Sequence, residues 1–218
     1  MVAQITEGTA FDKHGRPFRR RNFVPGIAMF AVLAVASLVI WVIALNQPAD
    51  VTEAAACNPP ADNTTSDPTQ SKLGEQVTRA SMTEVGPANL ADTKIRVLNA
   101  SGQGGQAAEV AGQLRDLGFA EPTAENDPLY ANNRLSCQGQ IRFGPSGRAA
   151  AAAVWLVAPC MELFQDQRPD NTVDLAIGSD FTELTRSDDT EAVLSSLRPE
   201  ATAPPDPSLI SKIHSTAC

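Results

Sequence analysis

The fold follows from residues 94–117, which read KIRVLNASGQGGQAAEVAGQLRDL. Lys94 to Leu98 form a short run that predicts a β-strand. The glycine-rich residues 99–105 then turn the chain, because glycine adopts positive φ without steric cost. Apolar residues next recur every three or four positions, which predicts a helix with one apolar stripe that Gly118 ends: Ala107, Val110, Ala111, Leu114 and Leu117.

The same order of strand, turn and helix returns at residues 140–157. Residues 140–143 predict a strand, residues 144–147 a turn, and residues 148–157 an alanine-rich helix. Further strands are predicted at 161–165 and 173–177, and further helices at 188–197 and from Asp206 onward. Two such units predict an α/β fold: a small sandwich in which helices pack on a mixed, partly parallel sheet.

Before this domain, residues 27–45 read IAMFAVLAVASLVIWVIAL, without a charge or a proline. A helix of this length rises about 1.5 Å per residue and spans a hydrocarbon core of about 30 Å. Residues 1–26 carry five basic residues against two acidic ones, so we expect this tail to be cytoplasmic. The prediction is a single-pass anchor in the plasma membrane with an extracytoplasmic C-terminal domain.

Cleavage of this segment is the alternative, since secretory signals also begin with a basic stretch and an apolar run. An apolar signal core has only about 7–15 residues, fewer than are found here. A lipoprotein-type site at residues 54–57 lacks the usual large aliphatic residue three positions before Cys57. A retained anchor is therefore favoured.

The remaining chain divides by composition. Residues 46–76 are rich in proline and polar residues and predict an extended or disordered linker. Residues 77–200 predict the α/β domain, with a weak alternating segment at 76–85 that favours an edge strand. Residues 201–218 predict a tail with a short helix.

The charge balance limits what the domain binds. Residues after 50 include 12 basic and 22 acidic residues, so a nucleic-acid partner held by a basic surface is excluded. The chain has only two histidines, His14 in the basic tail and His214 near the C-terminus. We expect no catalytic residues, no metal site and no cofactor.

All four cysteines follow the apolar segment, on the side where disulfides persist. A six-residue strand rises about 20 Å and a twelve-residue helix returns about 18 Å, so Cys137 and Cys160 are expected at the same end of the sheet. We therefore predict two disulfides, Cys137–Cys160 and Cys57–Cys218. Free thiols or a metal site are the alternatives, although no CxxC motif is present.

The turn at residues 102–107 fits the pattern G-x-G-x-x-A, in which helix N–H groups can face an anion. A tight turn that lets the helix pack closely on the sheet explains the same residues. The binding hypothesis is a site for a lipid phosphate or an anionic wall polymer, with both predicted helix starts at one sheet edge. Its residues are Ser101, Gly102, Gly104, Gly105, Arg142 and Arg148.

Residues 97–102, 105–108 and 141–144 resemble the LytR_C domain. This domain is found at the C-terminus of LytR-CpsA-Psr cell-wall ligases and alone in some single-pass actinobacterial envelope proteins. The resemblance covers about residues 93–180 and implies a non-catalytic role in keeping the envelope an effective permeability barrier. It implies wall polymer, envelope lipid or another envelope protein as partner, or alternatively an auxiliary role beside a ligase. The catalytic domain of the ligases, with its phosphate-binding arginines, has no counterpart in this chain.

Overall fold

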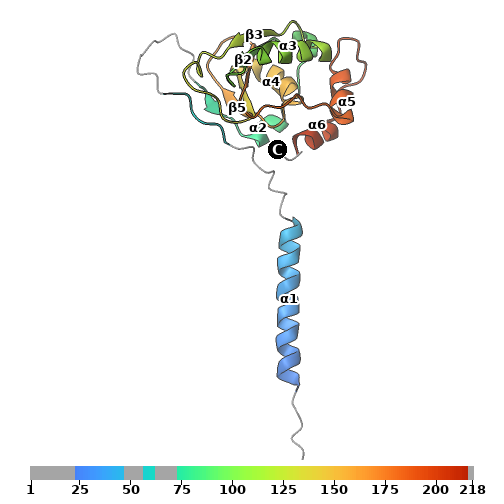
Figure 1. The fold of residues 1–218 in the computed structure, drawn as a ribbon. Coiled ribbons are helices and arrows are strands. Elements are labelled where there is room, and N and C mark those ends of the chain that lie inside the picture. The colour runs from blue at the N-terminus through green and yellow to red at the C-terminus, as the bar shows by residue number, and fades with distance from the viewer. Residues whose placement is uncertain (1–22, 47–55, 62–72, 216–218) are drawn as a thin grey trace, which may run out of the picture. The chain divides into compact units, whose positions relative to one another are not determined.

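A computed structural model describes residues 23–46, 56–61 and 73–215 (Figure 1). The chain forms two compact units, Met1–Asp50 and Val51–Cys218. In the first unit, helix α1 (Val24–Asn46) has 23 residues and contains the predicted apolar segment. It is long and apolar enough to cross a membrane. Every exposed large apolar side chain in the described part of the chain belongs to residues 23–41.

The second unit is built on a six-stranded mixed sheet with the order β1-β5-β4-β6-β2-β3. The strands are β1 (Glu75–Gln76), β2 (Ile95–Asn99), β3 (Thr123–Asn126), β4 (Gly139–Phe143), β5 (Glu162–Gln165) and β6 (Val173–Ile177). Strand β2 pairs in parallel with β3 and β6, and β4 pairs in parallel with β5. The pairs β4·β6 and β1·β5 are antiparallel. The predicted mixed α/β architecture is confirmed.

Two β-α-β units make up most of this sheet. Helix α3 (Gln106–Leu117) connects β2 to β3, and helix α4 (Arg148–Trp155) connects β4 to β5 after a 3-10 turn at Pro145–Gly147. Because β4 is antiparallel to β6 while β2 is parallel to it, the two units run in opposite directions. Helices α3 and α4 therefore begin at opposite ends of the strands. The expectation that both helices begin at the same side of the sheet is wrong.

Three more helices complete the domain: α2 (Arg79–Thr83), α5 (Asp188–Ser196) and α6 (Pro207–His214). Their starts follow from capping residues. The Ser187 side chain accepts a hydrogen bond from the backbone N–H of Thr190, and Asp206 accepts one from Ser208. The acidic residues in the first turn of α5 also interact favourably with the helix dipole.

One face of the sheet carries the main hydrophobic core, to which all five helices of this unit contribute. Helix α4 lies in the middle of these helices (Figure 1), and Ala150–Ala153 are all buried. Small side chains let a helix that is buried on every side approach its neighbours closely. The largest fully buried side chain, Trp155, ends this helix.

The opposite face of the sheet carries a smaller cluster that includes Leu98, Tyr130, Leu135 and Cys137. The loop at residues 127–138 supplies three of these four side chains. Residues 56–61 also pack here, and Cys57 lies against the same cluster. This part of the predicted linker is therefore fastened to the domain.

A disulfide joins Cys57 to Cys137, 80 positions apart in sequence. The predicted pairs Cys137–Cys160 and Cys57–Cys218 are therefore wrong. Cys137 and Cys160 do lie at the same edge of the sheet, because they precede the paired strands β4 and β5. Cys137 pairs with Cys57 instead, because residues 56–61 pack against the same face of the sheet as the cluster that contains Cys137. Cys218 lies outside the described residues, and no described cysteine is a free thiol.

Two further segments differ from expectation. The predicted edge strand at 76–85 is a strand only at Glu75–Gln76, and residues 79–83 form α2. Strand β3 was not predicted, because all four of its residues are exposed and polar or small, so no apolar alternation marks it.

Candidate functional site

The glycine-rich turn is held together by its own side chains. The Asn99 side chain accepts a hydrogen bond from the Ser101 backbone N–H and donates one to the Gln103 carbonyl. The Ser101 hydroxyl accepts a hydrogen bond from the Gln103 N–H and lies 2.5 Å from Oε1 of Gln106. Ser101 is fully buried, so its hydroxyl stabilises the turn from inside.

The glycines of this turn permit its backbone conformation and leave the start of α3 uncovered. Gly102 and Gly105 have φ values of 78° and 83°, which strongly favour glycine. Gly105 is the N-cap of α3, and no side chain caps this helix start. Gly104 and Gly105 are exposed, so the start of α3 is open to a ligand. Anion binding at this turn stays a prediction.

The two arginines of the predicted site lie elsewhere. Arg142 is buried on the face of the sheet that carries no helices, where its guanidinium lies 2.8 Å from a carboxylate oxygen of Asp127. Arg148 begins α4 at the other edge and donates hydrogen bonds to the Gln165 side chain and the Ser81 carbonyl. The structure therefore brings together the four turn residues but neither arginine.

A cleft does open beside this turn. One cavity of about 480 Å³ lies along the start of α3 and is lined by Gln103, Gly104, Gly105, Gln106, Glu109, Val110, Gln113, Phe181 and Thr182. A second cavity of about 340 Å³ adjoins it at Phe181 and Thr182, which line both. We call the two cavities together the Phe181 cleft. Ligand sites often lie at the carboxyl ends of strands in α/β sheets, and the cleft lies where β2 and β6 end.

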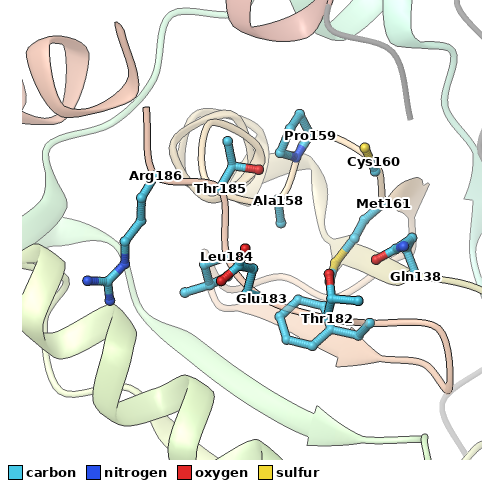
Figure 2. A pocket seen from close by; sticks show the side chains of 11 residues that line it. Gln138, Ala158, Pro159, Cys160, Met161, Thr182, Glu183, Leu184, Thr185 and Arg186 are labelled. Atoms are coloured by element: carbon cyan, nitrogen blue, oxygen red, sulfur yellow. The ribbon is translucent and has the colours of Figure 1, made fainter. Parts of the chain in front are cut away.

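The chemistry of the Phe181 cleft is mixed. In the second cavity, Met161 and Thr182 point toward each other, with Gln138 and Pro159 nearby (Figure 2). The lining of the cleft includes amide, hydroxyl and carboxylate groups as well as apolar side chains. Such a lining offers hydrogen bonds and apolar contact, and its charged groups are of both signs: the carboxylates of Glu109 and Glu183 and the guanidinium of Arg186.

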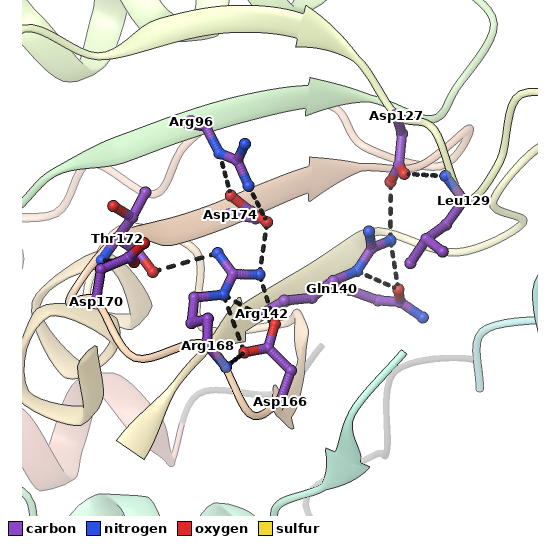
Figure 3. Close-up of polar contacts among 10 residues, drawn as sticks. All are labelled: Arg96, Asp127, Leu129, Gln140, Arg142, Asp166, Arg168, Asp170, Thr172 and Asp174. Carbon is purple, nitrogen blue, oxygen red and sulfur yellow. Dashed lines mark hydrogen bonds and ion pairs between the residues drawn. The ribbon is translucent and has the colours of Figure 1, made fainter. Parts of the chain in front are cut away.

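Buried charges lie on the opposite face of the sheet in two clusters (Figure 3). In the first cluster, Asp174 of β6 accepts two hydrogen bonds from Arg96 and one from Arg168. Arg168 also pairs with Asp166. Burial lowers the pKa of Arg168, but the hydrogen bonds to Asp166 and Asp174 outweigh burial and raise that pKa above its ordinary value.

The second cluster is centred on Arg142. Its guanidinium contacts Asp127, donates two hydrogen bonds to the Gln140 side chain, and lies 5.5 Å from the ring centroid of Tyr130. Asp127 also accepts a hydrogen bond from the Leu129 N–H, which fixes the following loop. Burial raises the pKa of Tyr130. Both clusters are internally paired, so they hold the loops of this face in place.

A third and larger cavity of about 760 Å³ lies between residues 56–59 and strands β1 and β5. Its lining is predominantly apolar and includes Val77, Met161 and Leu163. Cys57 and Cys160 both line it. The sequence did not predict this cavity, because its walls are far apart in the chain and residues 56–59 belong to the predicted linker.

The described residues contain no group of three or more His, Cys, Asp or Glu side chains placed to hold a metal ion. The buried histidine, His214, stacks on Trp155 and is not one of the residues that line the Phe181 cleft. The Phe181 cleft offers a ligand polar and apolar groups side by side. Sequence patterns located its α3 half but not the loop at residues 178–187, whose cleft residues carry no motif.

Comparison with known proteins identifies the family. Residues 92–181 match the LytR_C family, described as LytR cell envelope-related transcriptional attenuator. The chain is similar to the cell envelope integrity protein Cei of Mycobacterium tuberculosis, with 64% identity over 218 residues and 100% of both chains covered.

A solved structure is also similar: the soluble domain (residues 71–217) of a conserved hypothetical secreted protein from Mycobacterium marinum. The identity is 68% and the TM-score 0.66, covering 67% of this chain and 99% of that one. Because Cei is 64% identical to this chain over the full length of both proteins, and residues 92–181 match the family model, the chain belongs to the LytR_C family of cell envelope proteins.

Proposed function

We propose that this protein is a non-catalytic, membrane-anchored protein that maintains the integrity and the permeability barrier of the cell envelope. Helix α1 would span the plasma membrane, with residues 1–26 in the cytoplasm and the α/β domain outside. The observation that carries the proposal is the 64% identity with Cei over the full length of both chains. The disulfide Cys57–Cys137 supports an oxidising location for the domain.

The domain would act by binding a wall polymer, an envelope lipid or an envelope-assembly protein in the Phe181 cleft. The cleft supports this because it is open, lies at the carboxyl ends of β2 and β6, and combines polar with apolar groups. A second candidate is an auxiliary subunit of a cell-wall polymer ligase, which the LytR_C match at residues 92–181 favours.

The first experiment tests the barrier role. A deletion strain of the native host is complemented with the wild-type gene or with Thr182→Trp, which fills the cleft, and uptake of a normally excluded dye is measured. Asp116→Trp is the matched control, because Asp116 is exposed on α3 but does not line the cleft. We expect only Thr182→Trp to leave uptake high. Normal dye uptake in the deletion strain overturns the barrier role, and full rescue by Thr182→Trp overturns the role of the cleft.

The second experiment identifies the partner. A photo-crosslinking amino acid is placed at Thr182 or at Asp116 in living cells, and the adducts are analysed by mass spectrometry. We expect an adduct specific to Thr182; a ligase subunit in it favours the second candidate, and polymer or lipid favours direct binding. Equal adducts at both positions contradict the cleft as the binding site. If the purified protein chemically converts a partner that was identified in an adduct, the non-catalytic role is contradicted.

A further inference from the structure

Residues 56–61, which we call the strap, are fastened to the helix-free face of the sheet. The strap follows α1 in the sequence, and Asn58 makes three hydrogen bonds to the rest of the domain. The Asn58 carbonyl accepts a hydrogen bond of 2.7 Å from the Tyr130 hydroxyl, and its side-chain oxygen accepts one of 2.6 Å from the Ser136 N–H. The Asn58 amide donates a third, of 3.0 Å, to the Arg134 carbonyl.

A covalent bond secures the same segment. Cys57 is joined to Cys137, which is 2% exposed and lies two residues before β4. The Cys57 N–H also donates a hydrogen bond of 3.1 Å to the Glu162 carboxylate at the start of β5. The strap is thus attached at the starts of two adjacent strands, β4 and β5.

This attachment changes how many residues separate α1 from the first point at which the chain is fixed to the domain. Ten residues lie between Asn46 and Cys57, and 28 lie between Asn46 and Glu75, where β1 begins. Fully extended, these segments reach about 38 Å and about 100 Å.

We propose that the Cys57–Cys137 disulfide is a clamp that sets the reach of the domain from the membrane. With the clamp closed, the domain is held by the short tether; without it, the strap can detach and the tether extends to β1. Opening the clamp therefore raises the greatest distance that the chain allows between α1 and the domain from about 38 Å to about 100 Å. This inference rests on the proposed anchoring by α1.

The domain does not depend on the strap for its fold. The M. marinum soluble domain contains residues 71–217 of its own chain, and 99% of it matches this structure. A variant without the clamp is therefore expected to fold, and thermal unfolding of the variant verifies this.

The test uses full-length protein in lipid vesicles. A donor dye is attached through a non-natural amino acid at the exposed position Asp116, the acceptor is a dye-labelled lipid, and energy transfer is measured after flotation. The Cys57→Ser/Cys137→Ser variant lacks the clamp, and Cys160→Ser/Cys218→Ser is the matched control. We expect lower transfer in the first variant, because its maximum reach increases from about 38 Å to about 100 Å, and unchanged transfer in the control.

The experiment distinguishes failure of the anchoring from failure of the clamp. If no version of the protein floats with the vesicles, the anchoring is overturned and the clamp with it. If all versions float and the clamp variant transfers energy as efficiently as the wild type, the strap is held by its hydrogen bonds alone and the clamp is overturned while the anchoring stands.

Discussion

The imidazole of His214 stacks on the indole of Trp155, with ring centroids 3.5 Å apart and ring planes 20° apart. Neither ring nitrogen of His214 has a hydrogen-bond partner among the described residues, and the side chain is buried. Arg79 donates a hydrogen bond to the His214 carbonyl, and its guanidinium lies 5.1 Å from the Trp155 ring centroid. This stack joins the last helix, α6, to the buried helix α4.

The stack predicts acid sensitivity. Burial, assisted by the charge of Arg79, lowers the pKa of His214 from 6.5 to about 4. The folded state therefore binds this proton less tightly than the unfolded chain, so the contribution to stability is complete above pH 6.5 and is lost as the pH falls toward 4. The loss amounts to at most about 3 kcal/mol.

Urea unfolding at a series of pH values measures this effect. The free energy of unfolding of the wild type should fall more steeply between pH 6.5 and 4 than that of His214→Phe, which keeps an aromatic ring against Trp155. Acidic groups common to both proteins cancel in this comparison. Parallel curves for the two proteins would contradict the assignment.

The cysteine partners give a second prediction. Once Cys57 and Cys137 are paired, Cys160 and Cys218 are the two that remain, and Cys160 is not a free thiol. Arg79 donates hydrogen bonds to the carbonyls of Pro159 and His214, so these two chain segments lie close together. The four residues that follow His214 in the sequence, up to Cys218, can reach at most about 13 Å. Peptide mapping without reductant should recover Cys160 linked to Cys218, and any peptide that links Cys160 to another cysteine refutes the pairing.

The glycine-rich turn offers a matched pair of substitutions. Neither Gly104 nor Gly105 has a neighbour within 4 Å of the position of an added Cβ, but only Gly105 has a positive φ. Gly105→Ala should destabilise the domain by about 1–2 kcal/mol, because alanine is strained in the left-handed region. Gly104→Ala should be neutral or stabilise by up to about 1 kcal/mol, because it restricts the unfolded chain. Thermal unfolding compares the two, and equal effects would refute the explanation.

The buried pair of Asp127 and Arg142 gives a third stability test. Their side chains are 0% and 4% exposed, so removing one leaves the other charged and buried. Asp127→Ala should cost about 3–5 kcal/mol, and adding Arg142→Met should recover much of that loss. Lys212→Ala is the control, because Lys212 pairs with Asp189 at the surface and should cost less than about 1 kcal/mol. Chemical denaturation measures all of them, and a double variant less stable than Asp127→Ala argues against the pair.

Periodic sequence patterns located the elements that pack on the apolar face. The apolar stripe of α3 and the alanine-rich α4 were predicted because their buried residues recur with helical spacing. Strand β3 was missed because an exposed edge strand needs no apolar residues. Helix α2 was mistaken for strand because one buried residue, Met82, leaves almost no helical pattern.

The site was harder to predict than the fold. The turn at Ser101–Gly105 was found through its glycines, whereas the loop containing Phe181 and Thr182 has no motif and reaches the cleft through tertiary packing. The expected position of Arg148 was wrong because it depends on the relative direction of the two β-α-β units. That direction follows from how β6 pairs with β4, which spacing along the chain does not encode. The Cys57–Cys137 bridge was missed because its first half belongs to a segment with linker composition.

Strand β6 lies between β4 and β2, yet it is the last strand in the chain. The two β-α-β units therefore share no strand pairing until residues 173–177 have been made. A ribosome delivers the N-terminal half long before the strand that joins it to the second half, and such distant pairing is slow. We therefore expect the sheet to remain in two unpaired halves until nearly all of the domain has been synthesised.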